Sequence, residues 1–507
     1  MRGYTPPLTG WRRAGLDAVA MAVYVAIVYG TSLTIGPLGR DYALLAHPSD
    51  SVSRVAGWVL SSEVRLFGDA AWAYHCVNLG LLYACMLLLY RLTNRLVAGP
   101  WWFGTLAAVF FMANPVHSEA VLNLCGSVDL LPCLLALAAV TVYVESALAP
   151  RVWNIVLAPL LFGLAVLAAS QNAMLLPALI FFDLLLSPRR ERPLARLALP
   201  VAFSIVAWCL TPALFSMARL DPAGMFGPLY FIFYPLGFLP STARALVEHP
   251  VLGWAAAAAA LFILLLIYRK ARRPVLLFGL LSATSIRLFQ GDGFVDPVHM
   301  IGGGQLLLAN AFFNIALVCL FHRIMDHRKW RRQIVTLTTL LCVAFFALEF
   351  RSVLAWRHAS ALTRGIIQLA ACAESFGGSD GRPLAILTDF QYYAGAPMCV
   401  SASVAYETPF SEAMPVMSLI PLHYAPGINV DAYNLREKGG IVTITSESPV
   451  DLLCYPYVLS KPGGRQETDV AIIETIAISS RKLSLRIAYK GSEPLRAFLP
   501  EGFDNLP

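Results

Sequence analysis

Charge is scarce in this chain. Only 14% of its 507 residues are charged, whereas about a quarter is usual in a soluble domain. Residues of the set AVILMFWYC make up 58% of the chain. One water-soluble core cannot bury so much apolar surface, so the composition excludes a soluble enzyme. It also excludes a disordered chain, which has few apolar residues and a high net charge. A membrane protein with many spans, carrying one soluble part, remains.

Cysteine and glycine are also too sparse to define a class. Ten cysteines and 35 glycines are spread over the chain, which excludes a disulfide scaffold and a collagen. No Cys/His spacing is typical of zinc, and the use of a divalent metal stays open. The C-terminal part holds Cys372, Cys399 and Cys454. A Cys399–Cys454 disulfide is one pairing, and the odd number leaves the partner open.

Long apolar runs dominate what is present. A membrane-spanning helix needs about 20 mostly apolar residues. Eleven runs predict such helices: 15–36, 73–92, 100–114, 121–146, 152–170, 173–187, 197–217, 250–268, 274–290, 304–322 and 333–350. A twelfth run, 227–246, is interrupted by Pro235, Gly237 and Pro240, which favours a re-entrant or interfacial segment. The fold class predicted is an α-helical polytopic membrane protein of about 11 spans.

The basic residues predict the orientation. Short Arg/Lys runs follow the second, sixth, eighth and tenth spans, and cytoplasmic loops are rich in such residues. If 227–246 does not span, all the strong runs fall on the side of the N-terminus. The N-terminus is therefore expected in the cytoplasm, which in a bacterium places the chain in the inner membrane. No basic groove or nucleic-acid motif occurs, so no nucleic-acid partner is expected.

Two domains are predicted. Residues 1–350 form the membrane domain, and residues 351–507 form a soluble domain on the outer, or periplasmic, side. The second domain opens with a helical stretch to about Glu374, and a Gly/Ser break follows at 377–381. Strand-like runs then alternate with Gly, Pro and Asn turns, which is typical of a β-rich or α/β domain.

The first outer loop, 37–72, carries the first candidate for chemistry. Asp41 follows the first span directly, where a carboxylate could act as a general base toward an acceptor hydroxyl. A structural alternative is a helix-capping or interfacial Asp paired with Arg40. The stretch from Ser51 to Leu66 has an amphipathic pattern that predicts a helix lying on the membrane surface.

Three further outer segments carry polar residues at the membrane boundary. His75 and Asn78 share one helix face, and polar residues on such a face either line a cavity or join helices. In segment 114–131, His117 and Glu119 precede a span and Asp129 lies within it, while Ser118 resembles a helix cap. In segment 288–304, Gly302 to Gly304 follow Arg287, a candidate for binding a lipid phosphate. Arg219 and Arg244 are rivals for that role.

Three stretches resemble a known family: AWAYHCVNLGLLYACMLLLYRL, ANPVHSEAVLNLCGSVDLLPCLLALAAV and LAASQNAMLLPALIFFDLLL. They are similar to the membrane domain of the O-mannosyltransferases that act on cadherins and of their bacterial homologues, within the GT-C glycosyltransferase superfamily. The resemblance implies inverting transfer of a sugar from a polyprenyl phosphate to an exported protein or glycan, with Asp41 as base. It also implies that His117 and Glu119 shape the acceptor and donor site, with Arg287 a phosphate-binding candidate on its position alone. The polar positions of His75, Asn78 and Asp129 make them further candidates for substrate binding.

The chain departs from the family pattern at several charged positions. The usual acidic pair in the first loop is replaced by Asp41 flanked by Arg40 and Tyr42, and Gln171-Asn172 stands where a Lys-Glu pair is usual. A basic residue is also replaced at Ser127, and Gly304-Gln305 replaces a charged segment. These losses leave a second hypothesis open, a catalytically degenerate protein that assembles with a partner in a membrane complex. A transporter, polymerase or ligase is a third.

Overall fold

A computed structural model of the chain describes residues 10–38, 41–46, 53–97, 100, 102–148, 152–186, 274–288, 303–325 and 331–377. It also describes single positions between 201 and 259 and segments within 384–489. The described chain falls into two compact units. Unit 1 comprises Met1–Leu33 and Pro48–Val353, and unit 2 comprises Thr34–His47 and Leu354–Pro507.

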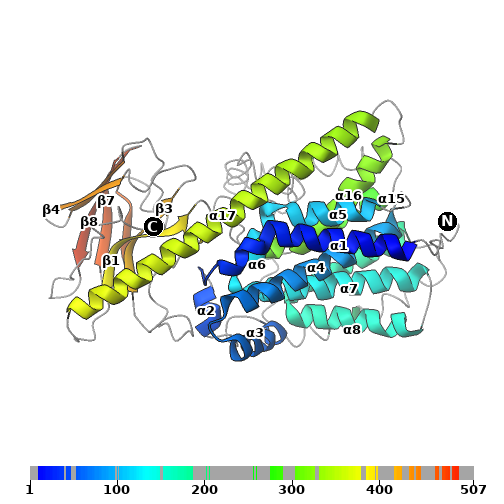
Figure 1. Ribbon diagram of the computed structural model, residues 1–507, viewed down its shortest axis with the longest axis horizontal. Helices are drawn as coiled ribbons and strands as arrows, with labels where there is room; N and C mark the ends of the chain where they lie inside the picture. The colour runs from blue at the N-terminus through cyan, green and yellow to red at the C-terminus, as the bar shows by residue number, and fades with distance from the viewer. Residues whose placement is uncertain are drawn as a thin grey trace. The chain divides into compact units, whose positions relative to one another are not determined.

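Helices make up the described part of unit 1. In chain order they are α1 (Gly10–Tyr29), α3 (Arg54–Phe67), α4 (Ala71–Leu96), α5 (Trp102–Ala113), α6 (Ser118–Leu122), α7 (Ser127–Leu148), α8 (Val152–Ala168), α9 (Leu175–Leu185), α15 (Pro274–Leu288) and α16 (Leu307–Met325). Short 3-10 turns join them: η1 (Gly30–Thr34), η2 (Pro115–His117), η3 (Leu124–Gly126), η4 (Ser170–Met174) and η7 (Gly303–Leu306). Figure 1 shows α1, α4, α7 and α8 running side by side.

Five of the helical segments are long and apolar enough to cross a membrane. They are Ala14–Thr34, Ala71–Leu96, Leu124–Ala147, Leu307–Met325 and Arg332–Ala361. Shorter apolar helices cover Trp102–Ala113, Val156–Ala168, Ser170–Leu185 and Pro274–Thr284. All nine coincide with expected spans. The expected spans 197–217 and 250–268, and the interrupted segment 227–246, lie outside the described residues.

Two kinds of contact hold these helices together. Phenylalanine side chains fill the interior around α5, α9, α15 and α16, where Phe278 meets both Phe182 and Phe312 edge to face. Tyrosine hydroxyls form hydrogen bonds that connect one helix to another. Tyr83 donates to the carbonyl of Ala18 at 3.0 Å, and Tyr143 donates to Asp183 at 2.6 Å. Hydrogen bonds of this kind between helices are favoured where no water competes for the donor.

The chain bends sharply between α5 and α7, in the segment that joins the two expected spans 100–114 and 121–146. Pro115 has no amide N–H to donate and opens η2, and Cys125 within η3 leaves helical geometry. The short helix α6 lies between these two turns. We call residues 114–127 the bend. The span expected at 121–146 therefore starts after the bend, and α7 itself begins at Ser127.

Helix α17 (Arg331–Gly377) is continuous across the boundary between the two units. The residues of α17 up to Val353 belong to unit 1. Those from Leu354 onward belong to unit 2, together with Thr34–His47. The helical stretch expected to begin the second domain is thus the continuation of the last span. Within unit 2, the short helix α2 (Asp41–Ala46) follows the first span, and Ser360 of α17 accepts a hydrogen bond from the Gly36 amide at 2.7 Å.

The remaining described elements of unit 2 are strands. β1 (Leu384–Tyr393) pairs parallel with β3 (Val416–Tyr424) and antiparallel with β2 (Ala396–Pro397). A second, antiparallel sheet has the order β4-β5-β8-β7-β6, formed by β4 (Tyr433–Lys438), β5 (Ile441–Ser446), β6 (Arg465–Glu467), β7 (Ala471–Ser479) and β8 (Lys482–Tyr489). The runs LAILTDF, GIVTITSE, DVAIIETIAIS and KLSLRIAY supply β1, β5, β7 and β8. The proposed Cys399–Cys454 pair lies outside the described residues.

Candidate functional site

Buried polar side chains collect around the bend, at the end of unit 1 where α4 and α7 begin. Asn78 of α4 is fully buried, and its Nδ2 donates to the carbonyl oxygens of Asn123 at 2.8 Å and Leu124 at 3.2 Å. Gly126 is required here. A Cβ at this position would overlap the carbonyl oxygen of Ala120 and lie 2.8 Å from Asn78 Nδ2. Asn78 and Gly126 together fix the path of the chain into α7.

Helix α3 brings a carboxylate to the same bend. Its buried stripe is Ala56, Gly57, Leu60 and Glu63, so the acid occupies a position where an apolar residue is usual. Glu63 is 5% exposed, and its Oε2 accepts a 2.8 Å hydrogen bond from Ser127 Oγ at the start of α7. Burial raises the pKa of Glu63 to about 7, and the Ser127 hydrogen bond opposes that rise.

The glycine-rich segment before α16 reaches the first turn of α7. A Cβ on Gly304 of η7 would overlap the carboxyl group of Asp129, so a larger residue here would have to displace that side chain. Turn η7 also contacts η2 and α6. Two polar segments that are far apart in sequence thus lie side by side.

His117 is fully buried at the end of η2. Its Nε2 lies against the carbonyl oxygen of Phe111 and 2.9 Å from Asn310 Nδ2 of α16. Asn314 donates to Asn310 Oδ1 at 3.0 Å and extends the network by one helical turn. Burial lowers the pKa of His117 to about 4, so its imidazole is neutral at pH 7. Here His117 serves as a neutral hydrogen-bonding group rather than as a cation.

A second network joins the bend to α17. Ser118 Oγ lies 2.7 Å from the carbonyl oxygen of Pro115 and 3.1 Å from Glu349 Oε2. Ser352 Oγ donates to Ser118 Oγ at 2.8 Å, and the Tyr29 hydroxyl of α1 adjoins the same carboxyl group. Ser118 was expected to cap α6, but His117 occupies the N-cap position without a side-chain hydrogen bond. The Ser118 hydroxyl instead contacts a carboxyl group of another helix.

Asp41 belongs to unit 2. It is fully buried and begins α2, and its Oδ2 accepts a 3.0 Å hydrogen bond from the backbone N–H of Leu38. The Asp41 amide in turn donates to the Leu38 carbonyl oxygen. This carboxylate orders the turn before α2, which agrees with the structural alternative of a capping role.

The other predicted residues fall into three groups. The first group is buried around the bend and comprises His75, Asn78, His117 and Glu119. Asp129 is partly exposed in the first turn of α7. Arg287 lies in α15, and its side chain is outside the described residues. Within the part of the chain that the structure describes, no three His, Cys, Asp or Glu side chains group as a metal site.

Two buried acids escaped the sequence reasoning. Glu63 lies within the apolar stripe of an amphipathic helix, and Glu349 lies inside the apolar span Arg332–Ala361. An acid inside a membrane-spanning run is itself a signal of a functional or joining position. An acid at the i+7 position after Ala56, where the stripe predicts an apolar residue, is a similar signal.

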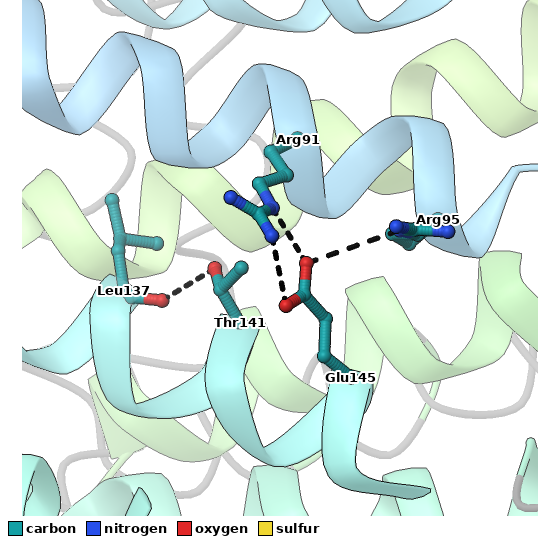
Figure 2. Close-up of polar contacts among 5 residues, drawn as sticks. All are labelled: Arg91, Arg95, Leu137, Thr141 and Glu145. Atoms are coloured by element: carbon teal, nitrogen blue, oxygen red, sulfur yellow. Dashed lines mark hydrogen bonds and ion pairs between the residues drawn. The ribbon is translucent and has the colours of Figure 1, made fainter. Parts of the chain in front are cut away.

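The opposite end of α4 and α7 is built differently. There Arg91 makes a two-point contact with Glu145, in which Nη2 lies 2.9 Å from Oε2, and Arg95 Nε lies 3.9 Å from Glu145 Oε1 (Figure 2). The arginine side chains are half exposed. Charges at this end are paired and exposed to solvent, whereas polar groups at the bend are buried.

Taken together, the described residues define an α-helical membrane protein with a polar site at one end of its helices. Among curated proteins, the chain has weak, partial similarity to two O-mannosyltransferases of the GT-C class. It is 26% identical over 117 residues to Protein O-mannosyl-transferase TMTC2 of Homo sapiens, which covers 23% of this chain. It is 34% identical over 113 residues to Protein O-mannosyl-transferase Tmtc2 of Drosophila melanogaster, which covers 21%.

These matches cover a small part of each relative. The aligned residues span 13% of the human protein and 12% of the fly protein. No family model matches the chain. The similarity therefore supports a distant relation to glycosyltransferases and leaves donor, acceptor and mechanism to be proposed.

Proposed function

We propose that the chain is a glycosyltransferase that moves a sugar from a polyprenyl phosphate to an exported protein or glycan. The observation that carries this proposal is the partial similarity to two proteins named as O-mannosyltransferases. The buried polar groups around the bend support it, because a sugar is bound through many hydrogen bonds. By analogy with those relatives, the donor sugar is mannose.

The proposed organisation is a membrane domain of residues 1–350 with about 11 spans and an extracytoplasmic β-rich or α/β domain of residues 351–507. The N-terminus lies in the cytoplasm. The exposed Arg91 and Arg95 support this orientation, because they share one end of α4 and cytoplasmic loops are rich in arginine. In this orientation, Asp41 and the bend lie at the outer ends of their spans.

The proposed reaction is a single displacement at the anomeric carbon. The acceptor hydroxyl forms a bond to that carbon as the bond to the phosphate oxygen breaks, and the configuration inverts. Asp41 takes the proton of the attacking hydroxyl, and the polyprenyl phosphate leaves with the bonding electron pair. Arg287 neutralises the departing phosphate, for which a guanidinium is well suited. His75, Asn78, His117, Glu119 and Asp129 position the two substrates.

The test is the Asp41→Asn substitution in the native cell. Asparagine has nearly the size of aspartate and can still accept the Leu38 hydrogen bond, but it cannot accept a proton. Asp69→Asn is the matched control, because Asp69 is an exposed acid of the same loop. We expect one class of exported glycan to disappear in the Asp41 variant alone, when both proteins reach the membrane equally. Normal glycans in that variant would contradict a base role for Asp41.

A catalytically degenerate membrane subunit is the second candidate. It is favoured by Asn172, which stands where the family resemblance places a charge. Asn172 Nδ2 donates to the carbonyl oxygens of Pro132 at 3.1 Å and Ala165 at 2.9 Å, so this residue joins η4 to α7 and α8. For this candidate, deletion of the gene has a phenotype, Asp41→Asn has none, and a partner subunit is recovered with the chain.

A further inference from the structure

Three buried side chains at the bend have polar atoms that the rest of the described chain does not satisfy. Glu63 Oε1, Asn78 Oδ1 and both amide atoms of Asn123 have no hydrogen-bond partner among the described residues. Glu63 is 5% exposed, and the two asparagines are fully buried. Such groups are uncommon in folded proteins, because burying a polar atom without a partner costs about 1–3 kcal/mol.

The three side chains flank one short stretch of chain. Asn78 donates to the backbone of residues 123 and 124, and Glu63 accepts from Ser127 three residues further on. Between these two contacts, Gly126 places its backbone against the Asn78 amide. Three different parts of the sequence, in α3, in α4 and in the bend itself, thus bring hydrogen-bonding groups to the same turn.

Stability does not explain the unsatisfied atoms of these residues. Other buried amides of unit 1 use their hydrogen-bonding groups, as Asn172 does with two backbone carbonyls. The Asn123 side chain makes no hydrogen bond with the described residues. An apolar side chain at this position would avoid the free-energy cost of burying an unpaired amide. A polar group that is costly for folding is expected at a functional site.

We propose that Glu63, Asn78 and Asn123 bind the hydroxyl groups of a sugar ring. This inference rests on the proposed function and assigns residues to the sugar part of the substrate. The same hydrogen-bonding chemistry fits the sugar of a lipid-linked donor and the sugar of a glycan acceptor.

The chemistry of the three side chains suits such a ligand. The Asn123 amide offers donors and an acceptor, whereas Asn78 offers its Oδ1 as an acceptor because its Nδ2 donates within the bend. The Glu63 oxygen Oε1 can accept from a hydroxyl. Neighbouring hydroxyls on a pyranose ring both donate and accept, so a mixed set of neutral groups matches them better than a set of cations. Burial raises the pKa of Glu63 to about 7, so a neutral carboxyl form is also available near neutral pH.

The experiment compares two lipids on the purified full-length protein in detergent. One is a short-chain polyprenyl phosphate mannose, and the other is the same polyprenyl phosphate without the sugar. The dissociation constant of each is measured by its concentration-dependent increase in thermal stability. The ratio of the two constants isolates the contribution of the sugar. Methyl mannoside, which has no lipid, forms a third arm that detects an acceptor-like sugar site.

The central variant is Asn123→Ala, with Asn172→Ala as its matched control. Both remove a buried amide, but only the Asn172 amide makes hydrogen bonds within the described structure. We expect Asn123→Ala to weaken binding of the mannose lipid about tenfold, as for the loss of one or two hydrogen bonds. Its affinity for the sugarless lipid and its melting temperature should be unchanged or higher. Asn172→Ala should lower the melting temperature and leave the ratio unchanged.

Glu63→Gln gives an independent test, because glutamine can still accept the Ser127 hydrogen bond and so keeps α3 in contact with α7. This variant should also lose the preference for the mannose lipid. The inference is overturned if the unaltered protein prefers the mannose lipid and both variants keep that preference. The proposed function fails separately if the unaltered protein binds neither lipid. Loss of methyl mannoside binding in both variants would assign the site to an acceptor sugar.

Discussion

The polar groups at the two ends of α4 and α7 differ in their burial and in their partners. At the end where these helices finish, Arg91, Arg95 and Glu145 form an exposed ion pair cluster (Figure 2). At the end where they start, Asn78, Glu63 and Ser127 are buried, and their hydrogen bonds are made with the backbone or with each other. One end thus has paired charges, whereas the other has buried polar groups, some of whose atoms no described residue satisfies.

The largest expected effect tests the bend itself. Gly126→Ala places a Cβ where it would overlap the Ala120 carbonyl oxygen, and backbone on both sides cannot move easily. We expect a loss of about 3 kcal/mol in the free energy of unfolding, at the upper end for overpacking. Gly80→Ala is the control, because a Cβ on this exposed residue of α4 meets nothing within 4 Å. Thermal unfolding in detergent measures both, and equal melting temperatures would contradict the described path of the bend.

The next effect concerns the amide that holds the bend. Asn78→Ala leaves the carbonyl oxygens of Asn123 and Leu124 without this donor, and a buried unsatisfied group is costly. We expect a loss of about 2 kcal/mol in stability, measured by the same thermal unfolding. A variant as stable as the unaltered protein would mean that Asn78 does not organise the bend.

A smaller effect follows from the burial of Glu63. Its pKa is raised by burial from the usual carboxyl range near 4.5 to about 7, so the folded protein binds more protons than the unfolded chain between these values. The contribution of Glu63 to stability is therefore fully present below pH 4.5 and is lost as pH rises toward and through 7. Glu63→Gln should remove this dependence.

The measurement is the difference in melting temperature between Glu63→Gln and the unaltered protein across pH 4.5 to 8. His117, whose pKa burial lowers to about 4, acts in the opposite sense: its contribution is lost as pH falls from about 6.5. It is present in both proteins and cancels in the difference. A difference that does not change with pH would contradict the burial of Glu63.

The smallest effect is expected at the other end of the helices. The Arg91–Glu145 pair has a two-point geometry, but the arginine side chain is 58% exposed. We expect a coupling energy below about 1 kcal/mol in a double-mutant cycle of Arg91→Ala and Glu145→Ala. A coupling as large as the Asn78 effect would remove the contrast between the two ends.

Sequence reasoning located most helices because long apolar runs and amphipathic patterns are strong signals. A helix was expected at 51–66 and is present as α3, Arg54–Phe67, and five expected spans have membrane-crossing length. A break between the spans 100–114 and 121–146 was expected, but the path of the chain through it was not. That path depends on the close approach of Gly126 to Asn78, a residue far away in sequence.

The candidate site was predictable only in part, for the same reason. His75, Asn78, His117 and Glu119 were selected because polar residues at the ends of apolar runs stand out, and all are buried in the structure. Glu63 and Glu349 were missed because each contacts a residue far away in sequence, Ser127 and Ser118 respectively. Such pairs depend on how helices pack, which a single sequence does not reveal. The roles proposed for Asp41 and Arg287 stay predictions.

The central claim is that the bend end of the helices holds the sugar of a lipid-linked substrate. The most direct measurement is photocrosslinking of the full-length protein with a polyprenyl phosphate mannose that carries a photoreactive group on the sugar. Mass spectrometry then locates the labelled peptides. We predict labels within α3 and residues 114–129, reduced by an excess of the unlabelled lipid. Labels confined to the opposite end, around Arg91, Arg95 and Glu145, would contradict the account.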